Sequence, residues 1–109
     1  MSDYFLRPAG SARFDPSKAT KADVAHGSQL FLGLNCFERG QSQPVHTHAG
    51  ADKFYLLLSG KARMTVGGDT QVADAGTLVW APAEVPHGVD EALERTVMLV
   101  GIAPPPGRK

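Results

Sequence analysis

Three of the four histidines in this chain of 109 residues stand where they can meet in space. His46 and His48 are separated by one residue, and His87 follows Pro86 further along the chain. Alternate residues of a β-strand project from one face about 7 Å apart, so His46 and His48 can approach one cation together. Neutral imidazole is the commonest ligand of zinc, iron, copper and nickel, and a set of three leaves coordination positions open. We therefore predict that His46, His48 and His87 bind one divalent transition metal (Fe, Mn, Zn, Ni or Cu).

A second interpretation of the same pattern is two polar side chains that face solvent beside a turn. The His-x-His spacing taken alone favours this interpretation. The fourth histidine, His26, precedes Gly27 in an apparent turn, where we expect it at the surface. The choice between the two interpretations depends on the elements that position the histidines.

The composition limits the kinds of protein this chain can be. It is 42% hydrophobic and 20% charged, which suits one compact domain. The formal net charge is +0, from 11 basic and 11 acidic side chains without a basic stripe, so we expect neither nucleic acid nor a membrane as partner. The single cysteine, Cys36, excludes an intramolecular disulfide, and residues 1–8 lack the basic start and apolar stretch of a signal peptide. We therefore expect a cytoplasmic protein.

Short apolar segments separated by glycine and proline predict an all-β fold. The chain carries 12 glycines and 8 prolines, and no long segment repeats its apolar residues at the helical period. We expect about eight short strands, typical of a sandwich or barrel, including residues 28–37, 45–48, 53–58, 61–66, 70–73, 77–81 and 95–102. Residues 90–94 have some helical character but are too few for an independent helix. We interpret residues 1–27 as an N-terminal arm with room for one strand, 28–103 as the barrel domain and 104–109 as a tail.

Two segments around the histidines resemble the two motifs of the cupin superfamily. The run from Gly40 to His48, followed by Gly60, resembles G-x5-H-x-H-x3,4-E-x6-G, and the run from Gly76 to His87 resembles G-x5-P-x-G-x2-H-x3-N. The matching positions are Gly40, His46, His48, Gly60, Gly76, Pro82 and His87. The motifs stand in the right order and cover about half of the chain. The resemblance implies a double-stranded β-helix, or jelly-roll barrel, with the metal inside the barrel mouth.

The chain departs from these motifs at three positions. Lys53 stands where the family has a glutamate ligand, Glu84 where it has a glycine, and Glu91 where it has an asparagine. Strand alternation places Lys53 on one face with Tyr55 and places Asp52 on the other face. Asp52 therefore replaces the missing metal ligand only if a bulge re-aims it. Glu91 is expected to be structural or exposed.

Lys53 poses the main question about the site. A divalent cation repels an ammonium beside it, and burial lowers the pKa of a lysine. Three outcomes are open: Lys53 swings toward solvent, it pairs with an anionic substrate or with Glu84, or it has displaced the metal. The retained histidines favour the first two outcomes. We count Lys53, Glu84 and Tyr55 as candidate catalytic residues, although Glu84 can equally be a solvated turn residue and Tyr55 a core residue.

Two kinds of function are consistent with these residues. By resemblance, a site of three histidines implies a metal-dependent dioxygenase, isomerase or decarboxylase acting on a small organic molecule. Three neutral ligands leave the charge of the metal uncompensated, which favours an anionic substrate. The alternative is a non-catalytic module that binds or senses a small molecule. Because the segments 53–58 and 95–102 are apolar on both faces, we also expect a homodimer that buries one outer sheet face.

Overall fold

Nine antiparallel strands and one short 3-10 helix, η1 (Pro8–Ser11), make up the regular structure of residues 4–107, which a computed structural model describes. Residues 1–3 of the predicted arm and 108–109 of the predicted tail lie outside the described residues. No helix within the described range is long and apolar enough to cross a membrane. The strands are β1 (Thr20–His26), β2 (Phe31–Phe37), β3 (Gln43–His46), β4 (Asp52–Ser59), β5 (Lys61–Val66), β6 (Asp69–Asp74), β7 (Leu78–Ala81), β8 (His87–Ala92) and β9 (Thr96–Ala103).

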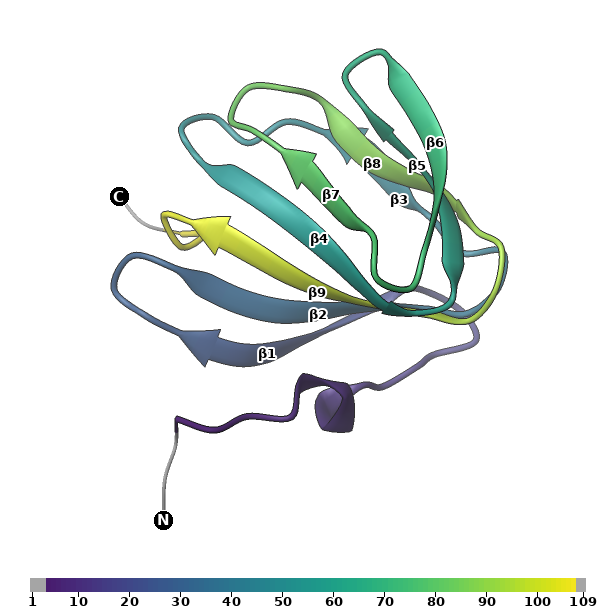
Figure 1. The fold of residues 1–109 in the computed structure, drawn as a ribbon, viewed down its shortest axis with the longest axis horizontal. Coiled ribbons are helices and arrows are strands. Elements are labelled where there is room, and N and C mark those ends of the chain that lie inside the picture. Colours follow the sequence, from purple (N-terminus) through teal and green to yellow (C-terminus); the bar gives the residue numbers. More distant parts are fainter. Residues whose placement is uncertain (1–3, 108–109) are drawn as a thin grey trace.

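The strands form two sheets that face each other (Figure 1). The larger sheet has five strands in the order β1-β2-β9-β4-β7, and the smaller has four in the order β3-β8-β5-β6. Strands that are distant in the sequence are neighbours in both sheets, because the chain passes repeatedly from one sheet to the other. This arrangement confirms the predicted all-β double-stranded β-helix.

The space between the sheets is filled by apolar side chains. Alternate residues of β4 point into it: Tyr55 and Leu57 are at most 1% exposed, whereas Phe54 and Leu56 on the other face are half-buried. Each fully buried apolar side chain of this size stabilises the fold by about 1.5–3 kcal/mol through its removal from water. The core residues are Phe37, Tyr55, Leu57, Ala62, Met64, Ala73, Ala81, Val89, Ala92, Met98, Val100 and Ile102.

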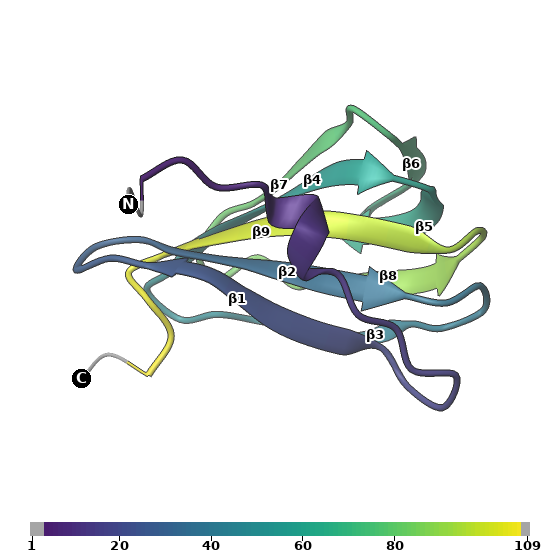
Figure 2. The same cartoon turned by 90° about the horizontal axis from the view of Figure 1, so that it is seen from below.

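A second apolar cluster lies on the outer face of the five-stranded sheet. Its buried members are Leu34, Cys36 and Val97, and Ala12 and Phe14 of the N-terminal segment pack against them. Figure 2 shows this segment, with η1, lying against the sheet. The chain therefore covers part of the outer apolar surface itself, and any partner needs to cover only the remainder.

One glycine makes the passage from the larger sheet to the smaller possible. Gly60 links β4 to β5 with a φ of 89°, a conformation that disfavours any residue with a Cβ. A Cβ at this position would also overlap the carbonyl oxygen of Arg95 and the hydroxyl of Thr96. The motif glycine is thus required both by its backbone angle and by the close approach of the chain before β9.

β1 is the one strand for which the predicted N-terminal arm left room, whereas β8 departs from the expectations. β1 lies within the predicted N-terminal arm, so the five-stranded sheet begins at Thr20. β8 had not been expected, and residues 90–94, with their helical character, lie partly in it. β8 is central in its sheet, where β3 and β5 pair with its two edges. These pairings with distant segments outweigh the weak local preference of its acidic residues.

Candidate metal centre

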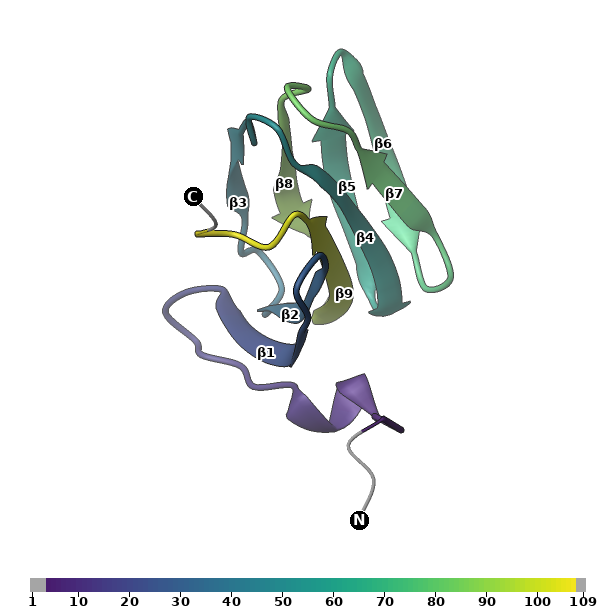
Figure 3. The same ribbon diagram turned by 90° about the vertical axis from the view of Figure 1, so that its left-hand side faces the viewer.

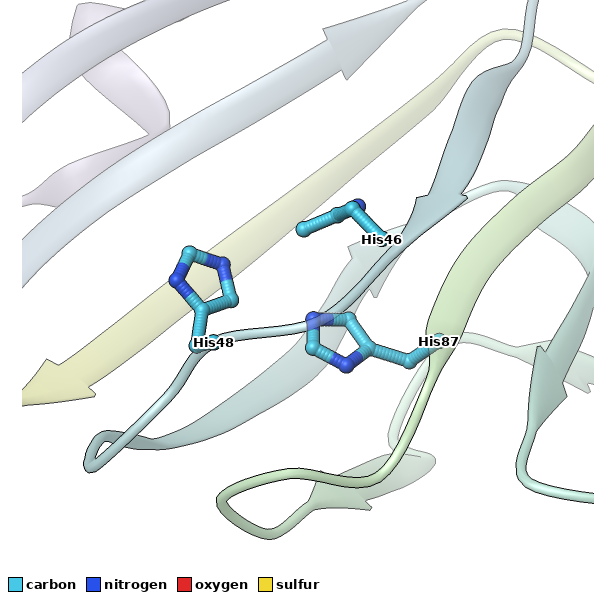
Figure 4. A group of neighbouring side chains, drawn as sticks. All are labelled: His46, His48 and His87. Atoms are coloured by element: carbon cyan, nitrogen blue, oxygen red, sulfur yellow. The ribbon is translucent and has the colours of Figure 1, made fainter.

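Strand pairing brings two of the three predicted ligands together. His46 ends β3 and His87 begins β8, and these residues are direct cross-strand partners. Their ring centroids lie 4.4 Å apart, and the ring of His48 is 4.9 Å from His46 and 5.4 Å from His87. One nitrogen from each ring lies within 4.8 Å of the others. The three imidazoles point toward one another in Figure 4, as the sequence predicts.

The route by which His48 reaches the cluster differs from the prediction. β3 ends at His46, so His48 does not share a strand face with it, and the predicted strand over residues 45–48 is too long at this end. The loop after β3 carries His48, and its carbonyl oxygen accepts a hydrogen bond from the backbone N–H of Glu84 at 3.0 Å. The turn between β7 and β8 therefore holds this loop in place.

Glu84 connects the same two segments a second time through its side chain. Its Oε2 accepts a hydrogen bond from the backbone N–H of Gly50 at 2.7 Å. Glu84 has a φ of 67°, in the left-handed region where the family motif has glycine. Its carboxylate is not one of the groups that converge with the three histidines within residues 4–107. Glu84 positions the loop of His48, and the turn interpretation of this residue agrees with the structure.

Backbone carbonyls orient two of the imidazoles. Nδ1 of His46 lies 2.9 Å from the carbonyl oxygen of Pro44, and Nδ1 of His87 lies 2.9 Å from that of Val85. A carbonyl can only accept, so each Nδ1 carries the proton and each Nε2 presents its lone pair. Metal-binding histidines are commonly oriented in this way.

The free ring nitrogens fit a metal ion. Nε2 of His48 and Nε2 of His87 are buried, and neither has a hydrogen-bond partner within the part of the chain that the structure describes. A buried polar atom without a partner costs about 1–3 kcal/mol, which a coordinated cation would remove. Two such atoms side by side are the observation that most directly indicates a metal site.

The environment also keeps the imidazoles in the form that binds metal. Burial lowers the pKa of His48 to about 4, and the positive charge of Lys53 adds to this effect. Burial likewise lowers the pKa of His87, although its hydrogen bond to Val85 opposes the shift. Both rings are therefore neutral near pH 7, and protons compete little with a cation for them.

Lys53 points into the barrel and is only 4% exposed. Its Nζ lies 4.6 Å above the ring of Tyr55, in a cation–π contact. Burial lowers the pKa of Lys53 to about 8, and the charge of Lys21 contributes to the shift. Within residues 4–107, Nζ of Lys53 has no hydrogen bond and no ion pair. Lys53 therefore neither swings toward solvent nor pairs with Glu84, so these two expected outcomes were wrong.

Of the other two candidates, Asp52 lies outside the histidine cluster, whereas Tyr55 lies beside it. Asp52 is exposed, and its Oδ1 accepts a hydrogen bond from the backbone N–H of Ala83 at 2.9 Å, so it does not join the histidines. Tyr55 is fully buried, and its hydroxyl donates to Oε1 of Gln43 at 2.9 Å. Its ring centroid lies 6.1 Å from that of His87. Tyr55 is thus both a core residue and a neighbour of the site, and burial raises the pKa of its hydroxyl.

A cleft of about 510 Å³ opens beside the histidines, large enough for a small organic molecule. His46, His48 and Lys53 border it together with Lys21, Asn35 and Gln43. The sequence alone did not indicate the last three residues, because they lie on β1, β2 and β3 and meet only through the pairing and packing of these strands. The one available signal was Asn35, a polar residue within the otherwise apolar run of residues 30–37.

Glu84 offers a test of how this loop is held. Glu84→Ala and Glu84→Gly both remove the hydrogen bond to Gly50, and we expect each to weaken zinc binding about tenfold by loosening the loop of His48. Only the glycine variant relieves the left-handed backbone, so it should be more stable than the alanine variant by about 1 kcal/mol. Urea unfolding and zinc titration measure the two effects. Equal stability of the two variants would contradict the strained conformation.

Two facing antiparallel sheets with three imidazoles at one opening define the class of jelly-roll barrels that carry a histidine cluster. Comparison with known sequences narrows this class. The sequence pattern of the cupin domain matches residues 33–102. An uncharacterized protein of Streptomyces coelicolor is 34% identical over 76 residues, which make up 70% of this chain and 71% of that protein. The chain belongs to the cupin family.

Solved structures agree with this assignment. A protein from Thermus thermophilus is 35% identical with a TM-score of 0.84, over 90% of this chain and 94% of that one. An RmlC-like cupin from Desulfovibrio desulfuricans is 30% identical with a TM-score of 0.77, over 86% and 90% of the two chains. KdgF from Halomonas sp. has a TM-score of 0.83 over 94% of both chains, but at 22% identity the likeness shows the fold alone.

Proposed function

We propose that this cupin is a metal-dependent enzyme acting on a small organic molecule, with the divalent metal bound by His46, His48 and His87. The observation that carries the proposal is the pair of buried Nε2 atoms of His48 and His87, which have no hydrogen-bond partner among residues 4–107 and lie beside a cleft of about 510 Å³. A metal in this position would supply Lewis-acid or redox chemistry. The reaction classes that fit are those of dioxygenases, isomerases and decarboxylases.

In this proposal, each residue at or near the site has a separate role. The three imidazoles bind the cation as neutral ligands, and the carbonyls of Pro44 and Val85 fix two of the rings. Tyr55 holds the amide of Gln43 at the cleft, because its hydroxyl donates to that side chain. Lys53 supplies a buried positive charge at the cleft wall, where it can hold an anionic group. Asp52 and Glu84 act outside the cluster by bonding to loop backbone.

Oxygen consumption and substrate loss test the enzymatic part of the proposal. The iron-loaded protein is screened against catechols, thiols and small carboxylates, with an oxygen electrode for oxidations and NMR for isomerisation or decarboxylation. We expect turnover of at least one class by the wild-type protein and none by His46→Ala/His48→Ala. Uniform absence of turnover by a fully loaded protein would contradict catalysis and favour a non-catalytic binding module.

We also propose a homodimer that buries the outer face of β4 and β7. Leu78 and Trp80 are 56% and 54% exposed there, and their cross-strand partners Leu56 and Phe54 extend the same apolar surface. The cytoplasmic location stays a prediction from the sequence.

Sedimentation analysis tests the dimer. The wild-type protein should sediment with the mass of two chains, and Trp80→Glu should sediment as one chain because it places a charge in the buried surface. Leu30→Glu is a matched control, since it changes another exposed apolar side chain, 43% exposed, in the turn between β1 and β2. A monomeric wild-type protein at all concentrations would contradict the proposal.

A further inference from the structure

An almost fully buried lysine that has no counter-ion in the described part of the chain lies in the wall of the cleft. Charged side chains that are almost fully buried are normally paired, because removal of a charge from water is costly. Lys53 is 4% exposed, yet the ion pairs of residues 4–107 join other residues, Arg63 to Glu91 and Arg95 to Glu38. The cation–π contact with the ring of Tyr55 compensates only part of this cost. The position calls for an anion that residues 4–107 do not provide.

A second lysine and a buried amide border the same cleft. Lys21 on β1 is the cross-strand partner of Asn35 on β2, and both line the cleft with Lys53. Asn35 is 5% exposed, so its amide is withdrawn from bulk water. Lys21 is close enough for its charge to act on Lys53. Two ammonium groups and an amide donor together form a binding surface for a carboxylate.

The topology leaves this surface open to ligands. β1 and β3 are edge strands of different sheets and do not pair with each other (Figure 3), and the cleft is lined by residues of both, Lys21 and Asp23 from β1 and Gln43 and His46 from β3. A smaller cleft of about 230 Å³ continues along this opening and shares Lys21, Asn35, Gln43 and Pro44 with the first. Asp23 is the one acidic residue that lines the larger cleft in the described part of the chain. The charge of the cleft is therefore positive before any cation is added.

The spacing between the lysine and the histidines suits a molecule of a few carbon atoms. Nζ of Lys53 is 4.6 Å from the ring centroid of Tyr55, and that ring is 6.1 Å from the ring of His87. Both groups therefore adjoin one aromatic ring, and His46, His48 and Lys53 border one cleft. A ligand of a few carbon atoms can therefore contact both Lys53 and the histidines.

We propose that Lys53, Lys21 and Asn35 form a carboxylate subsite, and that the substrates are small organic acids whose second oxygen group reaches the three histidines. This inference rests on the proposed metal site, since the histidines must hold a cation to receive the second group. It assigns the substrate class. It also gives Lys53, which stands where the family motif has glutamate, a role in substrate binding.

Calorimetric titration of the zinc-loaded protein with succinate and succinamate tests the subsite. The two probes have the same carbon chain, but succinamate carries one carboxylate where succinate carries two. We expect wild-type protein to bind succinate at least about tenfold more tightly than succinamate, as a charge-assisted hydrogen bond implies. Lys53→Met should lose this preference and Lys21→Met should reduce it, whereas Lys61→Met, an exposed lysine on β5 outside the cleft, should keep it.

Zinc content measured on the same samples separates the two proposals. Lys53→Met and Lys21→Met should retain the zinc stoichiometry of the wild-type protein, because neither residue is one of the three histidine ligands. Loss of the succinate preference with unchanged zinc content supports the subsite. An unchanged preference in both variants, or no binding of succinate by the zinc-loaded wild-type protein, overturns it. Absence of zinc from the wild-type protein overturns the metal site itself. Lys21 is exposed, so Lys21→Met keeps the test valid if the buried substitution prevents folding.

Discussion

Zinc is expected to raise the stability of the wild-type protein strongly and to leave the stability of His46→Ala/His48→Ala unchanged. A ligand that binds only the folded state stabilises it by about 4 kcal/mol at a free concentration a thousandfold above its Kd. For a domain of this size such a gain raises the Tm by more than about 10 °C. The double variant removes two of the three histidines, and we expect the imidazole of His87 alone not to retain the cation. Thermal unfolding with and without zinc, followed by circular dichroism, measures the difference.

The fourth histidine supplies the control for this experiment. His26 is exposed at the end of β1, where its ring contacts Phe31 edge-on with the centroids 5.5 Å apart. His26→Ala should respond to zinc as the wild-type protein does. A zinc response that persists in His46→Ala/His48→Ala and is lost in His26→Ala would place the metal elsewhere.

Lys53→Met is expected to stabilise the metal-free protein at pH 7 by about 1–3 kcal/mol. Burial lowers the pKa of Lys53 from 10.5 to about 8, so the folded protein holds the charged form at a cost. Methionine has a similar length and removes the buried charge without leaving a large cavity. The loss of the contact with Tyr55 subtracts a part of this gain. Urea unfolding at several pH values measures the effect.

The pH dependence of this difference follows from the lowered pKa. Below pH 8 the lysine is charged in both states, and the cost of its burial is complete. Between pH 8 and 10.5 the unfolded chain binds more protons than the folded one, so the stability of the wild-type protein rises with pH and the advantage of Lys53→Met shrinks. Above pH 10.5 the stability advantage of Lys53→Met should vanish. Lys61→Met changes an exposed lysine and should stay within about 0.5 kcal/mol of the wild type. A destabilised Lys53→Met at pH 7 would contradict an unpaired buried charge.

The sequence predicted those parts of the fold that depend on local alternation. Residues 53–58 alternate between the two faces of β4 as expected, and this alternation alone places Lys53 in the barrel and Asp52 outside it. β5 begins and ends at the predicted residues. The three histidines were identified from two spaced motifs, and His46 and His87 lie together because β3 and β8 pair.

Features that arise from contacts between distant segments could not be predicted in this way. The hydrogen bond from Gly50 to Glu84 joins residues 34 positions apart, and it determines where His48 lies once β3 has ended. The carboxylate subsite depends on Lys21, which faces the cleft only because β1 pairs with β2. Locally β1 is a polar segment with few apolar residues, and such an edge strand carries little signal of its own.

Metal analysis of the wild-type protein, purified without a nickel column and reconstituted with zinc or iron, is the most direct test of metal binding by His46, His48 and His87. We expect about one equivalent of bound divalent metal per chain, because two buried Nε2 atoms lack any other partner among the described residues. Less than roughly a tenth of an equivalent after reconstitution would contradict the metal site.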